Sequence, residues 1–148
     1  MILPAHAPHH SPARIGRLRC EDLENPAGID VPAPHLSWVV RSETRGERQT
    51  AYRILVASRG ARLGADEGDL WDSGRVESDQ SAHVVYAGAP LRPRLRCYWK
   101  VRVWDQRRQP SEWSAAALWA VGLLEPDDWA GSWIGLDEPA EPPAPWFP

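Results

Sequence analysis

The stretch between Arg96 and Ser114 holds the residues of this 148-residue chain that are best suited to binding chemistry. Indole rings alternate there with cationic side chains. A bare indole can stack on a sugar ring, whereas an indole covered by a guanidinium group forms a cation–π ladder. The candidate residues are Arg102, Trp104 and Trp113. Three interpretations stay open: a stabilising ladder, which the pattern favours, an aromatic platform for a sugar, and a docking surface for another domain.

Paired carboxylates offer a second kind of chemistry. A glycosidase holds two carboxyl groups about 5–9.5 Å apart across the bond that it cleaves. Candidate pairs of adjacent carboxylates include Glu21/Asp22, Asp66/Glu67 and Asp127/Asp128. All three pairs fall in polar turns or at strand ends, where neighbouring side chains usually point apart into water. We therefore expect no catalytic residue.

Metal, cofactor and thiol chemistry have less support. A zinc site needs several ligands on rigid elements, but His6, His9 and His10 lie in a proline-rich segment. The chain has no phosphate-binding glycine loop, nucleophile elbow or HExxH motif, so we expect neither a metal nor a cofactor. Cys20 and Cys97 lie in apolar, strand-like settings, which predicts two buried free thiols.

Composition narrows the range of partners. The formal net charge of -3 gives no strong attraction to nucleic acid or to an anionic membrane surface. No apolar run approaches the roughly 18 residues that span a bilayer. The first ten residues lack the basic region and the continuous apolar run of a secretory signal. This favours a cytoplasmic location without establishing it.

Both ends of the chain are rich in proline, which favours extended segments over packed ones. Residues 1–14 also contain three of the five histidines, and residues 136–148 contain five prolines. We expect a flexible Pro/His-rich tail over residues 1–14 and a β-sandwich over residues 15–124. Residues 125–148 are expected to be a linker toward a downstream domain that this sequence lacks.

Seven short segments between these ends carry the alternating pattern of half-buried strands. They are residues 15–21, 35–41, 50–58, 69–76, 82–87, 95–105 and 115–122. Only residues 59–69 could form a turn of helix, and internal glycines weaken that helix. Seven strands without intervening helices predict an all-β fold. We expect an antiparallel sandwich with fibronectin type III or immunoglobulin-like topology.

Alternation divides the longest predicted strand into two faces. We expect an inner set of Trp99, Val101 and Val103, and an outer set of Lys100, Arg102 and Trp104. Trp113 is expected to begin the neighbouring strand. The mixture of Trp and Arg resembles the interleaved side chains of cytokine-receptor modules, although only one Trp-Ser pair of their tandem motif occurs here. A receptor-like protein-interaction module is therefore an alternative.

A set of ordered motifs carries a second resemblance. The motifs are NPAGID (25–30), HLSW (35–38), RGERQTAYRILVAS (45–58), GDLWDSGRVESDQS (68–81), VYAGAPL (85–91), RCYWKVRVWD (96–105), WAVGLL (119–124) and DDWAGSWIG (127–135). In this order they resemble the N-terminus of bacterial α-L-rhamnosidases, glycoside hydrolase family 78, over about residues 15–135.

The resemblance implies a fibronectin III-like accessory module of a large enzyme that hydrolyses terminal α-L-rhamnose from glycosides. The acid and base carboxylates of such enzymes lie in a helical barrel hundreds of residues downstream, and no position here matches them. We therefore expect this chain to be inactive alone, and its partners to be the downstream domains of the same enzyme. Rhamnose-containing glycans are a further candidate partner, which keeps a carbohydrate-binding module as an alternative.

Overall fold

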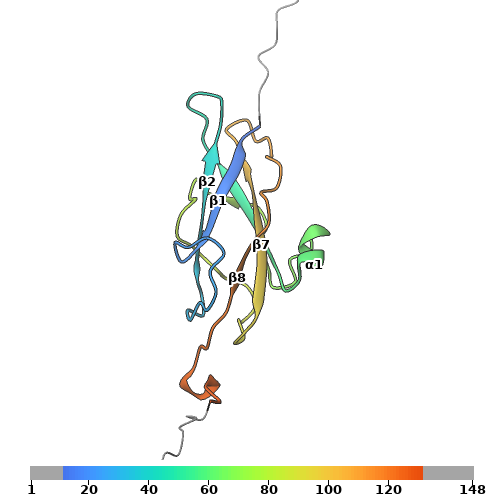
Figure 1. The fold of residues 1–148 in the computed structure, drawn as a ribbon. Coiled ribbons are helices and arrows are strands. Elements are labelled where there is room, and N and C mark those ends of the chain that lie inside the picture. Colours follow the sequence, from blue (N-terminus) through green and yellow to red (C-terminus); the bar gives the residue numbers. More distant parts are fainter. Residues whose placement is uncertain (1–11, 132–148) are drawn as a thin grey trace, which may run out of the picture.

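The computed structural model describes residues 12–131, which form two antiparallel β-sheets that face each other (Figure 1). The three-stranded sheet has the order β1 (Arg14–Cys20), β2 (His35–Arg41) and β6 (Val84–Val85). The five-stranded sheet has the order β4 (Trp71–Asp72), β3 (Ala51–Ala57), β7 (Arg96–Trp104) and β8 (Ala117–Ala120), and β5 (Val76–Glu77) also pairs with β3. The predicted all-β immunoglobulin-like sandwich is confirmed.

One of the predicted strands is divided into two in the structure. Residues 69–76 were expected to form a single strand, but the structure has β4 and β5 there, and both pair with β3. A turn separates them because Gly74 has a φ of +62° and its N–H donates to Asp72 Oδ1 at 2.9 Å. Residues 12–131 therefore contain eight strands where the sequence predicted seven.

The core lies between the two sheets and is built by the alternation of β3 and β7. Ile54 pairs with Val101 and Val56 with Trp99, so the inward residues of both strands meet. Trp99 is 1% exposed, and its ring meets the buried Trp119 ring edge-on at 6.4 Å. The predicted inner set of Trp99, Val101 and Val103 is fully buried and therefore confirmed.

The two cysteines belong to this core. Cys20 on β1 and Cys97 on β7 are free and buried, as the sequence predicts. Burial raises the pKa of each thiol to about 12. Because the thiolate is the reactive form, both side chains act as small apolar residues at neutral pH.

A short helix and one loop complete the sandwich. Helix α1 (Gly60–Gly64) is the helical turn expected within residues 59–69, and it lies on the outer side of the five-stranded sheet (Figure 1). The loop before β2 covers the edge of β8, since Ile29 bridges Val121 in parallel and the Ala120 N–H donates to the Pro26 carbonyl at 2.9 Å.

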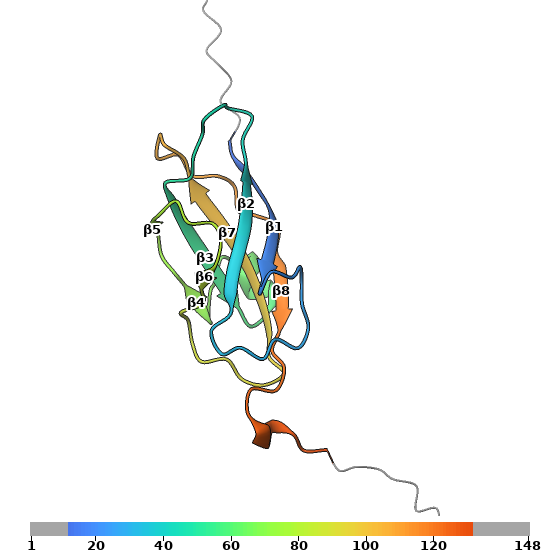
Figure 2. The same cartoon turned by 90° about the vertical axis from the view of Figure 1, so that its left-hand side faces the viewer.

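The chain enters the sandwich at one end and leaves it at the other, after the 3₁₀ helix η1 (Pro126–Asp128) (Figure 2). Residues 1–11 and 132–148 lie outside the described part. The flexible tail over residues 1–14 and the linker over residues 125–148 therefore stay predictions, and so does any role for the three histidines of the tail. Within the described residues no helix has the length and apolar character needed to cross a membrane.

Candidate functional site

Trp113 lies in an extended segment before β8 and does not begin that strand, so this prediction is wrong. Serine side chains explain the difference. Ser111 Oγ accepts the Val103 N–H and Ser114 Oγ accepts the Val101 N–H, each at 3.1 Å. These hydroxyls take backbone donors of β7 that a regular strand partner would otherwise satisfy. The segment is thereby fixed along β7, with Trp113 on the outer face.

The indole of Trp113 is the centre of a cation–π ladder on this outer face. The guanidinium carbon of Arg102 lies 4.6 Å from the ring centroid, and Lys100 Nζ lies 4.8 Å from it. Arg53 on the neighbouring strand β3 contributes a third cation at 6.0 Å. The structure therefore brings Arg102 and Trp113 together, as expected of a ladder.

Two carboxylates hold the cations of this ladder in place. Asp72 accepts two hydrogen bonds from the Arg53 guanidinium, at 3.0 and 2.7 Å. Asp66, in the turn after α1, forms an ion pair with Lys100. These bonds to Arg53 and Lys100 lower the pKa values of Asp72 and Asp66, respectively. Lys100 is only 7% exposed, so it occupies the predicted outer face but is covered there.

Arg53 and Asp72 were not among the candidate residues that the sequence suggested, and Asp66 was considered only as part of an acidic pair. A signal for Arg53 was present, because alternation places it on the outer face and its Cα partner is Arg102. The contact of Asp66 with Lys100 had no such signal. It depends on where the short helix lies over the sheet.

Trp104 belongs to a separate pair at the end of β7. Its ring lies 5.0 Å from the guanidinium carbon of Arg75, and Arg75 Nε also contacts Glu77 Oε1 at 2.8 Å. Arg102, Trp104 and Trp113 therefore do not share one stacking surface. The rings of Trp104 and Trp113 each have at least one cation beside them. This supports the ladder interpretation over a bare aromatic platform.

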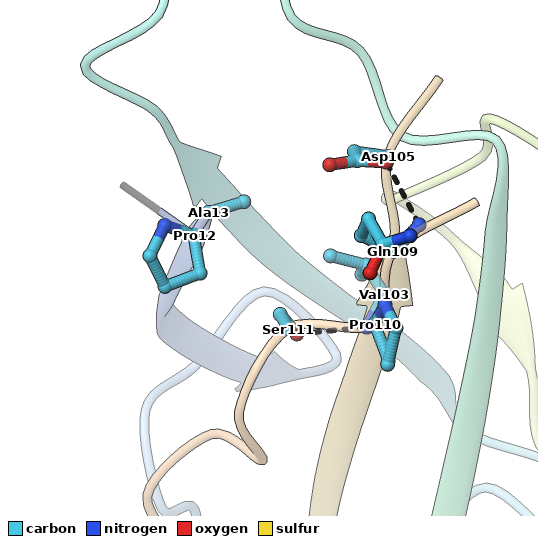
Figure 3. Close-up of a pocket in the computed structure, with 7 residues that line it drawn as sticks. All are labelled: Pro12, Ala13, Val103, Asp105, Gln109, Pro110 and Ser111. Atoms are coloured by element: carbon cyan, nitrogen blue, oxygen red, sulfur yellow. Dashed lines mark hydrogen bonds between the residues drawn. The ribbon is translucent and has the colours of Figure 1, made fainter. Parts of the chain in front are cut away.

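A pocket lies where β7 ends and β1 begins (Figure 3). Two of its polar residues, Asp105 and Gln109, belong to the turn that follows β7. The Asp105 N–H donates to the Gln109 carbonyl at 3.1 Å, and Asp105 Oδ1 accepts the N–H groups of Arg107 and Gln109. Pro12, Ala13 and Pro110 supply apolar walls. The polar groups of Asp105 and Gln109 are therefore used in hydrogen bonds that stabilise the turn.

The acidic pairs have structural partners. Glu21 accepts the His35 N–H at 2.6 Å and lies 3.0 Å from His35 Nδ1, and these contacts lower its pKa. Asp128 Oδ2 accepts the N–H groups of Leu124 and Glu125. Among residues 12–131, no group of three or more His, Cys, Asp or Glu side chains is arranged to hold a metal ion.

The two facing antiparallel sheets and their strand orders define the chain as an immunoglobulin-like β-sandwich module. The family described as "Rha78A-like, N-terminal immunoglobulin domain" matches residues 15–125. The chain belongs to this family, which confirms the resemblance seen in the sequence.

Similar proteins are α-L-rhamnosidases. The one from Streptomyces avermitilis is 44% identical over 129 residues, which are 87% of this chain and 12% of that protein. One from Formosa agariphila is 42% identical over 113 residues, 76% of this chain and 12% of that protein. The chain thus spans about 12% of the length of these relatives.

Solved structures agree with the sequence relatives. The S. avermitilis α-L-rhamnosidase in complex with L-rhamnose superposes with a TM-score of 0.78 at 45% identity, over 83% of this chain and 12% of that one. The α-L-rhamnosidase from Dictyoglumus thermophilum gives a TM-score of 0.79 at 35% identity, over 82% of this chain and 14% of that one.

Proposed function

We propose that this chain is a non-catalytic accessory module of an α-L-rhamnosidase, which braces the enzyme by packing against its other domains. The observation that carries the proposal is the match to the N-terminal immunoglobulin domain family, together with relatives that are α-L-rhamnosidases about eight times as long as the matched region. Hydrolysis of terminal α-L-rhamnose from glycosides belongs, in this proposal, to the enzyme as a whole.

The contacts of the acidic residues support the non-catalytic part of the proposal. Glu21, Asp66, Asp72 and Asp128 each bind a backbone N–H, a cation or both. A general acid of a glycosidase needs a raised pKa, whereas the pKa values of Glu21, Asp66 and Asp72 are lowered. These carboxylates are therefore poor proton donors at neutral pH.

The first test is an assay of the chain alone with p-nitrophenyl α-L-rhamnoside. We expect no release of p-nitrophenol above the enzyme-free blank. Turnover by purified chain that scales with its concentration would contradict the non-catalytic assignment.

A second test addresses bracing. The segment of the S. avermitilis enzyme that corresponds to residues 15–125 is deleted, or replaced by those residues of this chain. We expect the deletion to lower the Tm of the remaining enzyme and the replacement to restore most of it, because packed interdomain surface stabilises both partners. Equal Tm values for the deleted and intact enzymes would count against bracing.

A carbohydrate-binding module is the alternative of another class, and a receptor-like interaction module is a third. The cations beside Trp104 and Trp113 disfavour stacking of a sugar on either ring. Titration calorimetry with rhamnosides separates the first alternative from the proposal. Heat of binding that disappears in Trp104→Ala would favour the sugar platform, and its absence in the wild-type chain favours the accessory role.

A further inference from the structure

The three-stranded sheet has an open edge along the second half of β2. Strand β6 has two residues and pairs only with His35 and Leu36. Further along, the Trp38 N–H donates to the Ser81 carbonyl at 2.9 Å. Backbone groups of alternate residues in a strand point to the same edge, so the N–H and C=O of Val40 face this edge too. Neither group has a hydrogen-bond partner among residues 12–131.

A groove runs beside this edge. Its lining includes Val39 and Val40 together with Arg48, Asp79 and Ser81. Val39 is 40% exposed, which is high for a large apolar residue on a strand. The groove therefore combines two opposite charges with two apolar side chains and the unpaired backbone groups of Val40.

The base of the groove is held rigidly by Gln49. Its Oε1 accepts the Trp38 Nε1–H at 3.0 Å, and its Nε2 donates to the carbonyls of Ser78 and Gln80 at 3.1 and 2.8 Å. Gln49 itself is buried. The groove is thus preformed, which reduces the entropy lost when a segment binds there.

An unpaired edge with apolar side chains is a template for a further strand, and proteins usually block such edges or use them. The edge of β8 is blocked, since Ile29 bridges Val121 along it. The β2 edge has no equivalent cover within the described residues. We propose that an extended segment from a following domain of the same enzyme adds to β2 at Val40 and places an apolar side chain over Val39.

The choice of this occupant rests on the proposed function. The family is one of N-terminal domains, and the relatives are about eight times longer than the matched region. The rest of such a polypeptide is tethered to this module, so its effective concentration at the edge is far above that of any separate partner.

The test mixes the full ¹⁵N-labelled chain with the S. avermitilis enzyme from which the corresponding N-terminal segment has been deleted. Amide exchange is followed by NMR, and affinity by titration calorimetry. We expect binding, with exchange of the Val40 amide slowed at least tenfold because it gains a hydrogen-bond acceptor. Val39→Lys should weaken binding at least tenfold.

Val85→Lys is the matched control, because Val85 lies on the same sheet and is 49% exposed but does not line the groove. We expect this variant to bind like the wild-type chain. Binding that leaves the Val40 amide unprotected and tolerates Val39→Lys would overturn the edge assignment while leaving the bracing role intact.

Two further outcomes separate the edge assignment from the proposed function. No binding at all would contradict bracing itself, and the edge assignment with it. A dimer of the chain alone with a protected Val40 amide would give the edge to a second copy and overturn the assignment to a following domain.

Discussion

The outer face of the five-stranded sheet and the open edge of the three-stranded sheet are opposites. On the first, Trp113 contacts three cations, and two carboxylates neutralise two of them. On the second, the backbone groups of Val40 face a groove beside the exposed Val39. The aromatic and charged side chains of the outer face have their interaction partners within the domain. The open edge consists instead of unpaired backbone groups and exposed valine. The surface proposed to bind a partner is therefore the one whose backbone groups lack a contact.

The largest expected effect belongs to the layer beneath the ladder. Trp99→Ala should lower the free energy of unfolding by about 3–5 kcal/mol, because it leaves a cavity between the sheets. Arg102→Ala, three positions along the same strand but on the outer face, should cost only about 1 kcal/mol. Urea denaturation of both variants measures the difference. Equal losses would show that the ladder is as important to stability as the core.

Trp113→Ala should come next, at about 2 kcal/mol. The substitution removes one half-buried indole and the three cation contacts that converge on it. Thermal unfolding followed by circular dichroism measures the loss. A variant as stable as the wild-type chain would mean that the ladder only covers surface.

Acid should reduce the stability that the ladder contributes and should leave the edge of β2 unchanged. The pKa values of Asp66 and Asp72 are lowered in the folded chain by Lys100 and Arg53. Their stabilisation is complete above the unfolded Asp pKa of about 3.9 and is lost as the pH falls below it.

Urea midpoints at pH values between 5 and 2 measure this effect. Because other carboxylates also have lowered pKa values, the Asp72→Asn variant is the control. We expect its midpoint to fall less steeply with acid than that of the wild-type chain. Parallel slopes would contradict a role for Asp72 in the pH dependence.

The smallest effect is expected at the edge itself. Val39→Lys should change the free energy of unfolding by less than about 0.5 kcal/mol, because the side chain is exposed and the substitution leaves no cavity. Chemical denaturation of the isolated chain measures it. A loss above about 1 kcal/mol would mean that Val39 packs within the domain, and the contrast between the two surfaces would fail.

The fold could be predicted from the sequence because alternation is a local signal. It assigned His35–Arg41 without error, placed Trp99 inside and Arg102 outside, and put both cysteines in the core. The candidate site was predicted only in part. Arg102 and Trp113 do meet, whereas Trp104 pairs with Arg75.

What could not be predicted depends on contacts between distant parts of the chain. Asp66 and Lys100 are 34 positions apart and meet only because α1 lies on the sheet. Ser111 and Ser114 replace strand pairing with side-chain hydrogen bonds, which no hydrophobic pattern reveals. The open edge results from the short length of β6, which is a property of the sheet as a whole.

The buried ammonium of Lys100 has a further consequence, because it is the only lysine in the chain. A lysine-specific protease has a single target bond, in the middle of β7, whereas trypsin also has sixteen arginines to cleave. Cleavage after Lys100 requires the central strand to leave the sheet. When the strand returns to the sheet faster than the protease cleaves, the rate of that one cut reports the population of the opened domain. Limited proteolysis of the native chain therefore measures its opening equilibrium.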